Sequence, residues 1–247
     1  MLGLLVVGIL GCILQGIFIA VEHKKHYVSA VILKGLASVF FCIIGYYAYV
    51  YAGFVCGLSS HSELVTMAGQ TVEKSFVMGI ARLIFTGLIL GAAGDILLNL
   101  RFVFEKQGQK IFLLGIAAFL AGHIVYLISL IKFSNNILIC IVCGVVLAAI
   151  LLTIIFKSFE VKLAFKIFGV LYLGAVCLMA CFAAGNYFSN KSIYSLIYAV
   201  GAVLFLVSDV VLIFNTFGPK QLFSLRITNL SLYYAGQILI AASLFFI

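Results

Sequence analysis

The stretch Gly87-Leu-Ile-Leu-Gly-Ala-Ala-Gly-Asp-Ile-Leu-Leu-Asn99 decides how this chain must fold. It places an aspartate, Asp95, in a segment apolar enough to lie in a lipid bilayer. A charge at that depth costs roughly 2.5–3.5 kcal/mol on insertion scales, so it requires a reason. The chain has one other aspartate, Asp209, in a second stretch of the same character, residues 201–212. We therefore predict that the two carboxylates face each other at one polar site within the membrane.

The composition of the whole chain agrees with this reading. Of the 247 residues, 66% are hydrophobic and 9% are charged, and the mean hydropathy is +1.32, whereas a soluble chain is roughly half apolar and a quarter charged. The apolar runs are continuous and lack the short alternating strands of a membrane barrel. Since a helical span needs about 20 residues, we predict an all-α polytopic membrane protein with eight transmembrane helices. These are at about 2–20, 29–52, 78–98, 111–131, 137–156, 163–184, 193–216 and 228–246, with a long loop over 53–77.

Basic residues are divided unequally among the loops. Because positive loops favour the cytoplasmic side of a membrane, we expect the loops after the first, third, fifth and seventh spans in the cytoplasm and both termini outside. The net charge of +8 comes from these scattered residues and indicates no nucleic-acid partner. The first group of loops holds Lys24, Lys25, Arg101, Lys106, Lys110, Lys157, Lys162, Lys166, Lys220 and Arg226, and the other loops hold Lys74, Lys132 and Lys191.

The cysteines and histidines give no sign of a metal or redox centre. There are seven cysteines, all but Cys56 lie in apolar spans, and Cys140 and Cys143 form a single C-x-x-C in mid-helix. Cysteines of this kind are usually small buried hydrophobes. His123 lacks the two further membrane histidines that a zinc site would need. We expect no metal and no cofactor, and the sequence leaves the oligomeric state open.

An internal repeat relates the two aspartate stretches. Asp95 and Asp209 are 114 residues apart, and Ala121-Gly-His123 and Ala235-Gly-Gln237 have the same offset. Four spans per unit is an even number, so the two units would share one orientation, as in the parallel duplications of some transporters. We predict a single integral membrane domain built from two parallel four-helix repeats, at roughly 1–131 and 137–247.

Helical spacing gathers small and polar residues on the same faces. Gly87, Gly91 and Asp95 lie on one face, and the two glycines form a small-xxx-small pair that lets helices approach closely. Counted from the span ends, Asp95, Asp209 and Lys34 fall in the cytoplasmic half of the bilayer. The site is therefore predicted to have Asp95 and Asp209 as the catalytic pair and Lys34, Asn99, His123, Tyr126, Tyr233 and Gln237 as substrate-binding residues, with His123 and Tyr126 deeper, as a floor.

Each of these residues also has a structural interpretation. The aspartates could bond to a neighbouring helix, Lys34 could extend to the interface, and His123 could be a packing residue. Tyr233 and Gln237 could join helices rather than contact substrate. We favour function for the aspartates, because ionisable residues inside a membrane usually mark functional sites.

Two carboxylates in a medium of low dielectric constant would not both ionise, which gives one acid and one base at neutral pH. Such a pair suits acid-catalysed cleavage of an ether or acetal, or hydration of an amide. Lys34 could hold a phosphate or keep one aspartate ionised. The sequence does not decide which aspartate is the acid.

The chain resembles the YhhN family, which includes the lysoplasmalogenases. The resemblance lies in Gly94-Asp95-Ile-Leu-Leu98 and Gly115-Ile-Ala-Ala-Phe-Leu-Ala-Gly-His-Ile-Val-Tyr126. Further matches are 172–179, Ser208-Asp209 with Leu212, and Tyr233-Tyr234 with Gln237. The second span departs from the family pattern, because Lys34-Gly35 stands where the family tends to have Lys-Pro.

The resemblance implies a membrane hydrolase that cleaves the vinyl ether bond of a lysophospholipid, a lysoplasmalogen, to a fatty aldehyde and a glycerophospho-ethanolamine or -choline. Substrate and membrane lipid would then be the partners. A proton-coupled transporter is the main alternative, because parallel repeats with intramembrane carboxylates also suit transport. An intramembrane aspartyl protease fits less well, since Ala92-Ala-Gly94 precedes Asp95 where that class has Gly-x-Gly, and no Pro-Ala-Leu occurs.

Overall fold

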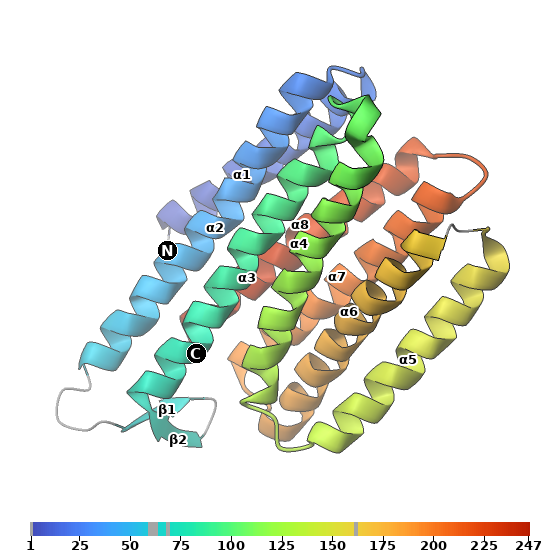
Figure 1. Cartoon of the computed structure of the whole chain (residues 1–247). Coiled ribbons are helices and arrows are strands. Elements are labelled where there is room, and N and C mark those ends of the chain that lie inside the picture. The colour runs from blue at the N-terminus through green and yellow to red at the C-terminus, as the bar shows by residue number, and fades with distance from the viewer. Residues whose placement is uncertain (1, 59–63, 68–69, 161–162) are drawn as a thin grey trace.

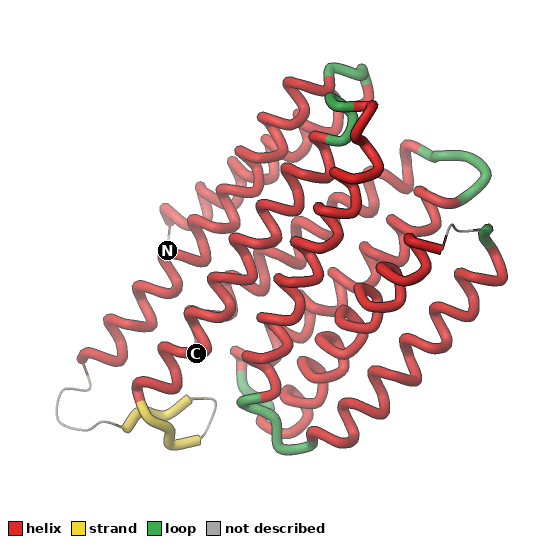
Figure 2. Tube along the Cα trace, viewed as in Figure 1, coloured by secondary structure: helices red, strands yellow, loops and turns green. Residues whose placement is uncertain are grey.

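The computed structural model describes residues 2–58, 64–67, 70–160 and 163–247 (Figures 1 and 2). Among these residues, eight helices are long and apolar enough to cross a membrane. The prediction of an all-α, multi-pass membrane protein is confirmed. The helices are α1 (Leu2–His23), α2 (Tyr27–Leu58), α3 (Lys74–Leu100), α4 (Gly108–Ile131), α5 (Ile137–Ser158), α6 (Leu163–Asn190), α7 (Ile193–Phe217) and α8 (Phe223–Ser243).

The connection between α2 and α3 differs from the predicted loop over 53–77. Helix α2 continues to Leu58, and two short antiparallel strands, β1 (Leu64–Met67) and β2 (Gln70–Glu73), lead directly into α3. Hydropathy marks only the part of a helix within the hydrocarbon, whereas the helix itself can continue beyond it. The strands contain Val65 and Val72, which pair with each other and pack against the core. Residues 59–63 and 68–69 of the predicted loop lie outside the described residues. Two short 3₁₀ turns, η1 (Glu105–Gln107) and η2 (Leu244–Phe246), precede α4 and follow α8.

The helices form consecutive antiparallel pairs that pack into one bundle (Figure 1). Helix α2 packs against α3 and α8, and α6 packs against α7 and α4. If four is added to each helix number, with α8 followed by α1, these contacts of α2 become the contacts of α6. This is the order that a parallel duplication would produce, although the duplication itself stays a prediction from the sequence.

Glycines allow the closest helix crossings. A Cβ atom on Gly122 of α4 would lie 3.3 Å from the carbonyl oxygen of Gly87 on α3, and one on Gly236 of α8 would lie 2.9 Å from that of Gly201 on α7. Both pairs put backbone against backbone, which small residues permit. The two crossings also occupy equivalent positions at the offset of 114 residues.

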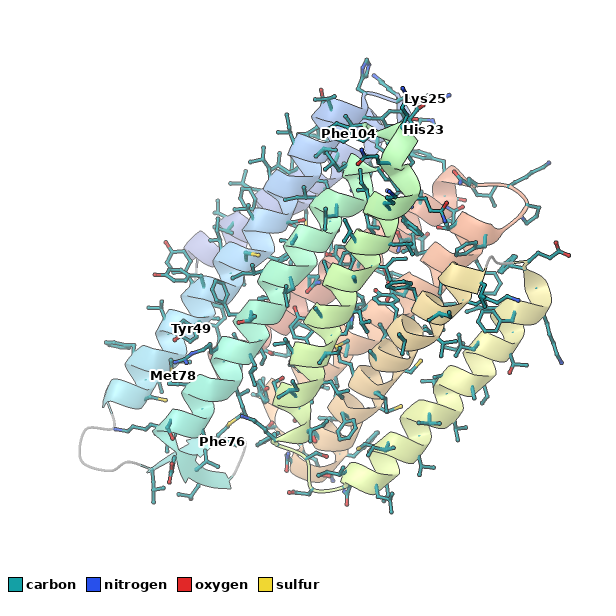
Figure 3. All side chains as sticks on the ribbon, viewed as in Figure 1. His23, Lys25, Tyr49, Phe76, Met78 and Phe104 are labelled. Atoms are coloured by element: carbon teal, nitrogen blue, oxygen red, sulfur yellow. The ribbon has the colours of Figure 1, made fainter. Side chains whose placement is uncertain are left out.

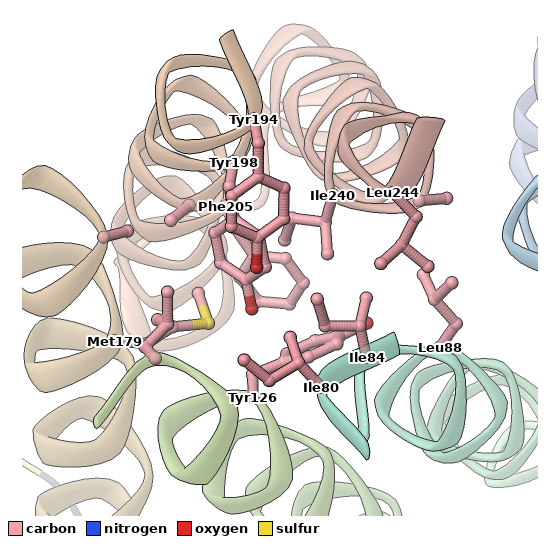
Figure 4. Close-up of a cluster of buried hydrophobic side chains, with 14 of the residues drawn as sticks. Ile80, Ile84, Leu88, Tyr126, Met179, Tyr194, Tyr198, Phe205, Ile240 and Leu244 are labelled. Carbon is pink, nitrogen blue, oxygen red and sulfur yellow. The ribbon is translucent and has the colours of Figure 1, made fainter. Parts of the chain in front are cut away.

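The apolar residues are distributed as a lipid environment requires. Helix α5 exposes Leu138, Ile139 and Val145 on the outer surface. Inside the bundle, buried aromatic and aliphatic side chains occupy much of the half nearest the β1–β2 hairpin and the α6–α7 turn. Figure 4 shows this cluster, which includes Ile80, Ile84, Leu88, Tyr126, Met179, Tyr194, Tyr198, Phe205, Ile240 and Leu244.

The two ends of the bundle differ in character. The C-terminal ends of α1, α3, α5 and α7 lie together at the end opposite the hairpin (Figure 1), and most of the basic loop residues follow these helices in the sequence. His23, Lys25 and Phe104 lie at that end, whereas Phe76 and Met78 lie towards the hairpin (Figure 3). We call the first the basic end of the bundle.

Candidate active site

A cavity of about 120 Å³ lies in the half of the bundle towards the basic end. Asp95 from α3 and Asp209 from α7 both line it. The remaining wall is largely apolar, with Phe119 and Phe205 among the residues that form it. The fold thus brings the two intramembrane carboxylates to one cavity.

Asp95 is held by three side chains from two other helices. The Lys34 Nζ lies 3.4 Å from its Oδ1. The Ser38 hydroxyl donates to its Oδ2 at 2.5 Å, and the Tyr233 hydroxyl donates to the same oxygen at 2.8 Å. Asp95 is 4% exposed and Lys34 is 1% exposed. A buried carboxylate next to an ammonium group and two hydroxyl donors is stabilised in its ionised form.

The ammonium group of Lys34 points into the protein rather than to the membrane interface. Besides the ion pair with Asp95, its Nζ donates to the Gln15 Oε1 at 3.3 Å. It also lies 4.6 Å from the centre of the Tyr233 ring, close enough for a cation–π contact. Lys34 is therefore the counter-ion of Asp95.

Asp209 has a different set of neighbours. The Tyr172 hydroxyl of α6 donates to its Oδ2 at 2.7 Å. Ser208, the residue before it, is bonded elsewhere, because the Asn229 amide donates to both the hydroxyl and the carbonyl oxygen of Ser208 at 2.9 Å. In the part of the chain that the structure describes, no cation forms an ion pair with Asp209 and no hydrogen bond joins it to Asp95. The two carboxylates are thus distinguished by their partners rather than by a proton held directly between them.

Asn99 lines the cavity, but its amide donates to the backbone oxygen of Asp95 at 2.9 Å. Three other predicted binding residues are not among the cavity's lining residues. The Tyr126 hydroxyl donates to the Gln237 Oε1 at 3.1 Å, and the Gln237 amide reaches the Tyr233 hydroxyl at 3.5 Å. His123 bonds through Nδ1 to a backbone oxygen at 2.7 Å and packs its ring against aromatic residues. Tyr126 and Gln237 therefore lie outside the cavity and form a chain of hydrogen bonds that leads to Tyr233. His123 belongs to the aromatic residues packed next to the cavity.

The sequence reasoning did not identify Ser38 or Tyr172 as site residues. Ser38 lies one helical turn after Lys34, so the spacing of helix α2 could have revealed it. Tyr172 occurs in a run that matches the family, yet no spacing relates it to Asp209. Its role follows only from the packing of α6 against α7.

The bonding patterns of the two aspartates are similar in the two halves of the chain, but in the part that the structure describes Lys34 and Tyr233 bond to Asp95 and not to Asp209. Ser38 of α2 donates to Asp95 of α3, and Tyr172 of α6 donates to Asp209 of α7. Tyr233, the second hydroxyl donor to Asp95, corresponds to Phe119 at the offset of 114 residues. Asp209 therefore lacks an equivalent donor on α4, and this breaks the symmetry of the pair.

Among the described residues, no three His, Cys, Asp or Glu side chains come together in a way that could hold a metal ion. The polar groups lining the cavity are carboxylates, phenols, two amides, a threonine hydroxyl and two kinds of cation. They can transfer protons, stabilise a cation and bind an anion.

These features define a polytopic α-helical membrane protein with a polar cavity built around two aspartates. Residues 58–244 match the model of the YhhN family, and because this match covers well over half of the sequence, the chain belongs to that family. No curated protein and no solved structure matches the chain.

Proposed function

We propose that this protein hydrolyses the vinyl ether bond of a lysoplasmalogen, releasing a fatty aldehyde and a glycerophospho-ethanolamine or -choline. The observation that carries the proposal is the presence of two buried aspartates with unequal partners in one largely apolar cavity. Membership of the YhhN family is consistent with a hydrolase.

Asp209 is the proposed acid and Asp95 the proposed base. The ammonium of Lys34 and the hydroxyls of Ser38 and Tyr233 favour the ionised form of Asp95, which suits it to the role of base. Asp209 has a neutral phenol as its partner, so ionisation would leave a second negative charge in the cavity without a cation beside it. Two carboxyl groups with unequal environments divide the acid and base roles between them.

The reaction begins with transfer of the Asp209 proton to the β-carbon of the alkenyl ether. The C=C π electrons form the new C–H bond, and an oxocarbenium ion remains. The Asp95 carboxylate stabilises this cation and accepts a proton from the water molecule that attacks it, which yields a hemiacetal. As the hemiacetal collapses, Asp95 protonates the leaving glycerol oxygen and Asp209 accepts the hydroxyl proton. Both residues return to their starting states with the aldehyde formed.

The surroundings of the cavity favour hydrolysis over transport. A transporter needs a path that can open to both sides of the membrane. Here the polar groups lie towards the basic end, and the cluster of Figure 4 fills the bundle between them and the hairpin end. A lysolipid can enter from one leaflet without such a path.

The test is lipid mass spectrometry with purified protein and a 1-alkenyl lysophospholipid. Loss of a general acid or base typically lowers a rate by about 10²- to 10⁴-fold, so Asp95→Asn and Asp209→Asn should each lose at least that much. Glu73→Gln removes an exposed carboxylate at the hairpin end and should keep the full rate. Folded Asn variants with undiminished aldehyde release would contradict the proposal.

A further inference from the structure

A second cavity, of about 260 Å³, lies at the basic end of the bundle. Its walls come from the α1–α2 turn, the end of α3 and the α7–α8 connection. Arg101, Leu212, Thr216 and Arg226 line both this outer cavity and the inner one with the aspartates. The outer cavity therefore adjoins the inner cavity, and two arginines stand where they meet.

The two arginines differ in their partners. Arg226 is neutralised by Glu22, which accepts from its Nε at 2.9 Å and from its Nη2 at 2.5 Å. Arg101 forms no ion pair within the described residues, and its buried Nε has no hydrogen-bond partner there. Arg101 is thus a cation without an ion pair in the described part of the protein, and Glu22, whose charge reaches it, is already paired with Arg226.

Aromatic rings fix the guanidinium of Arg101 in place. Its Cζ lies 4.5 Å from the centre of the Phe102 ring and 4.4 Å from that of the Phe112 ring. Such stacking occupies the flat faces of a guanidinium and leaves the N–H groups on its edge to bind a ligand. Two parallel N–H groups of a guanidinium can donate to two oxygens of one phosphate group.

We propose that Arg101 binds the phosphodiester of the lysophospholipid and thereby positions the ether bond between the aspartates. This rests on the proposed function. Arg101 follows Asp95 by six residues, which is about 9 Å along a helix axis, a length comparable to the extended span from the phosphorus through the glycerol and the ether oxygen to the β-carbon of the alkenyl group. Lys34 cannot take this role without releasing Asp95. The headgroup then occupies the outer cavity and the alkenyl chain the inner one.

The test measures binding with ligands that cannot react. A saturated 1-alkyl lysophospholipid and a 1-alkyl glycerol differ in the phosphate headgroup, and neither contains a vinyl ether. Arg101→Gln should weaken binding of the first at least tenfold, since a hydrogen bond to a charged group contributes about 1.5–3 kcal/mol, and should leave binding of the second unchanged. Retained binding of the alkyl glycerol shows that the variant is folded. Arg82→Gln, at the opposite end of the same helix and exposed, is the matched control and should bind both ligands as the wild type does.

Three results would overturn the inference. In the first, Arg101→Gln weakens the binding of both ligands equally. In the second, it weakens the binding of neither. In the third, the wild type binds both ligands with the same affinity. Competition by inorganic phosphate as strong as by glycerophosphoethanolamine would assign the site to free phosphate instead of a lipid headgroup. Arg101-dependent binding without any turnover of the alkenyl substrate would refute the proposed hydrolysis and leave the binding site standing.

Discussion

At the scale of single residues, neighbours make two similar aspartates different. Asp95 and Asp209 occupy equivalent positions at the offset of 114 residues, but only Asp95 has an ammonium group and two hydroxyl donors. Asp209 has one phenol. Two features explain this difference. Of the two aspartates, only Asp95 forms an ion pair with Lys34, and the position in the first half of the chain that corresponds to Tyr233 is occupied by Phe119, which has no hydroxyl group.

This difference predicts unequal losses of stability. Asp95→Asn leaves the ammonium of Lys34 buried without its counter-ion, which typically costs about 3–5 kcal/mol. Asp209→Asn removes one hydrogen-bonded acid, whose net contribution is about 0.5–1.5 kcal/mol. Unfolding of the detergent-solubilised variants should show the larger loss for Asp95→Asn. The double variant Lys34→Met/Asp95→Asn should recover most of it, and equal losses for the two single variants would contradict the ion-pair argument.

At the scale of helices, small residues decide which elements touch. The Gly87–Gly122 and Gly201–Gly236 crossings place backbones in contact and so fix the depth at which α3 and α7 present their aspartates. The sequence predicted the small face of α3 and the repeat offset. It did not predict the continuation of α2 to Leu58 or the β1–β2 hairpin, because hydropathy reports burial in lipid and is insensitive to where a helix ends.

We expect Gly201→Ala to separate α7 from α8. Its Cβ would lie 2.9 Å from the Gly236 carbonyl oxygen, a backbone atom that cannot rotate away. Overpacking of this kind costs about 1–3 kcal/mol, which should appear as a lower midpoint of thermal unfolding and a lower hydrolytic rate. Gly174→Ala on α6 is the matched control, since its Cβ would meet no atom within 4 Å and helix propensity favours alanine by about 1 kcal/mol. An unchanged midpoint for Gly201→Ala would argue against the close crossing.

At the scale of the whole molecule, the cavities lined by charged residues lie in one half of the bundle. The aromatic and aliphatic cluster of Figure 4 lies towards the hairpin end, where a further cavity of about 120 Å³ has no charged side chain among its described lining residues. The inner cavity with the aspartates and the outer cavity both lie towards the basic end. Substrate access is therefore proposed from the leaflet at the basic end. The positive-inside rule predicts that this leaflet is the cytoplasmic one.

The sidedness can be measured with single cysteines in a cysteine-free background. Lys106→Cys places the label between α3 and α4 at the basic end, and Lys191→Cys places it between α6 and α7 at the opposite end. In intact cells, a membrane-impermeant maleimide should label position 191 and should reach position 106 only after permeabilisation. The reverse pattern would place the basic loops outside.

The sequence by itself determined the class of this protein, its eight spans and the two aspartates, because continuous apolar runs and rare charges are local properties of the chain. It also predicted that Lys34, Asn99 and Tyr233 belong near Asp95, since span depth and helical face follow from residue counts. Only the tertiary structure decided that Lys34 pairs with Asp95, that Tyr172 bonds to Asp209, and that Arg101 has no acidic partner among the described residues. These relations depend on which helix faces which, and packing between distant segments sets that.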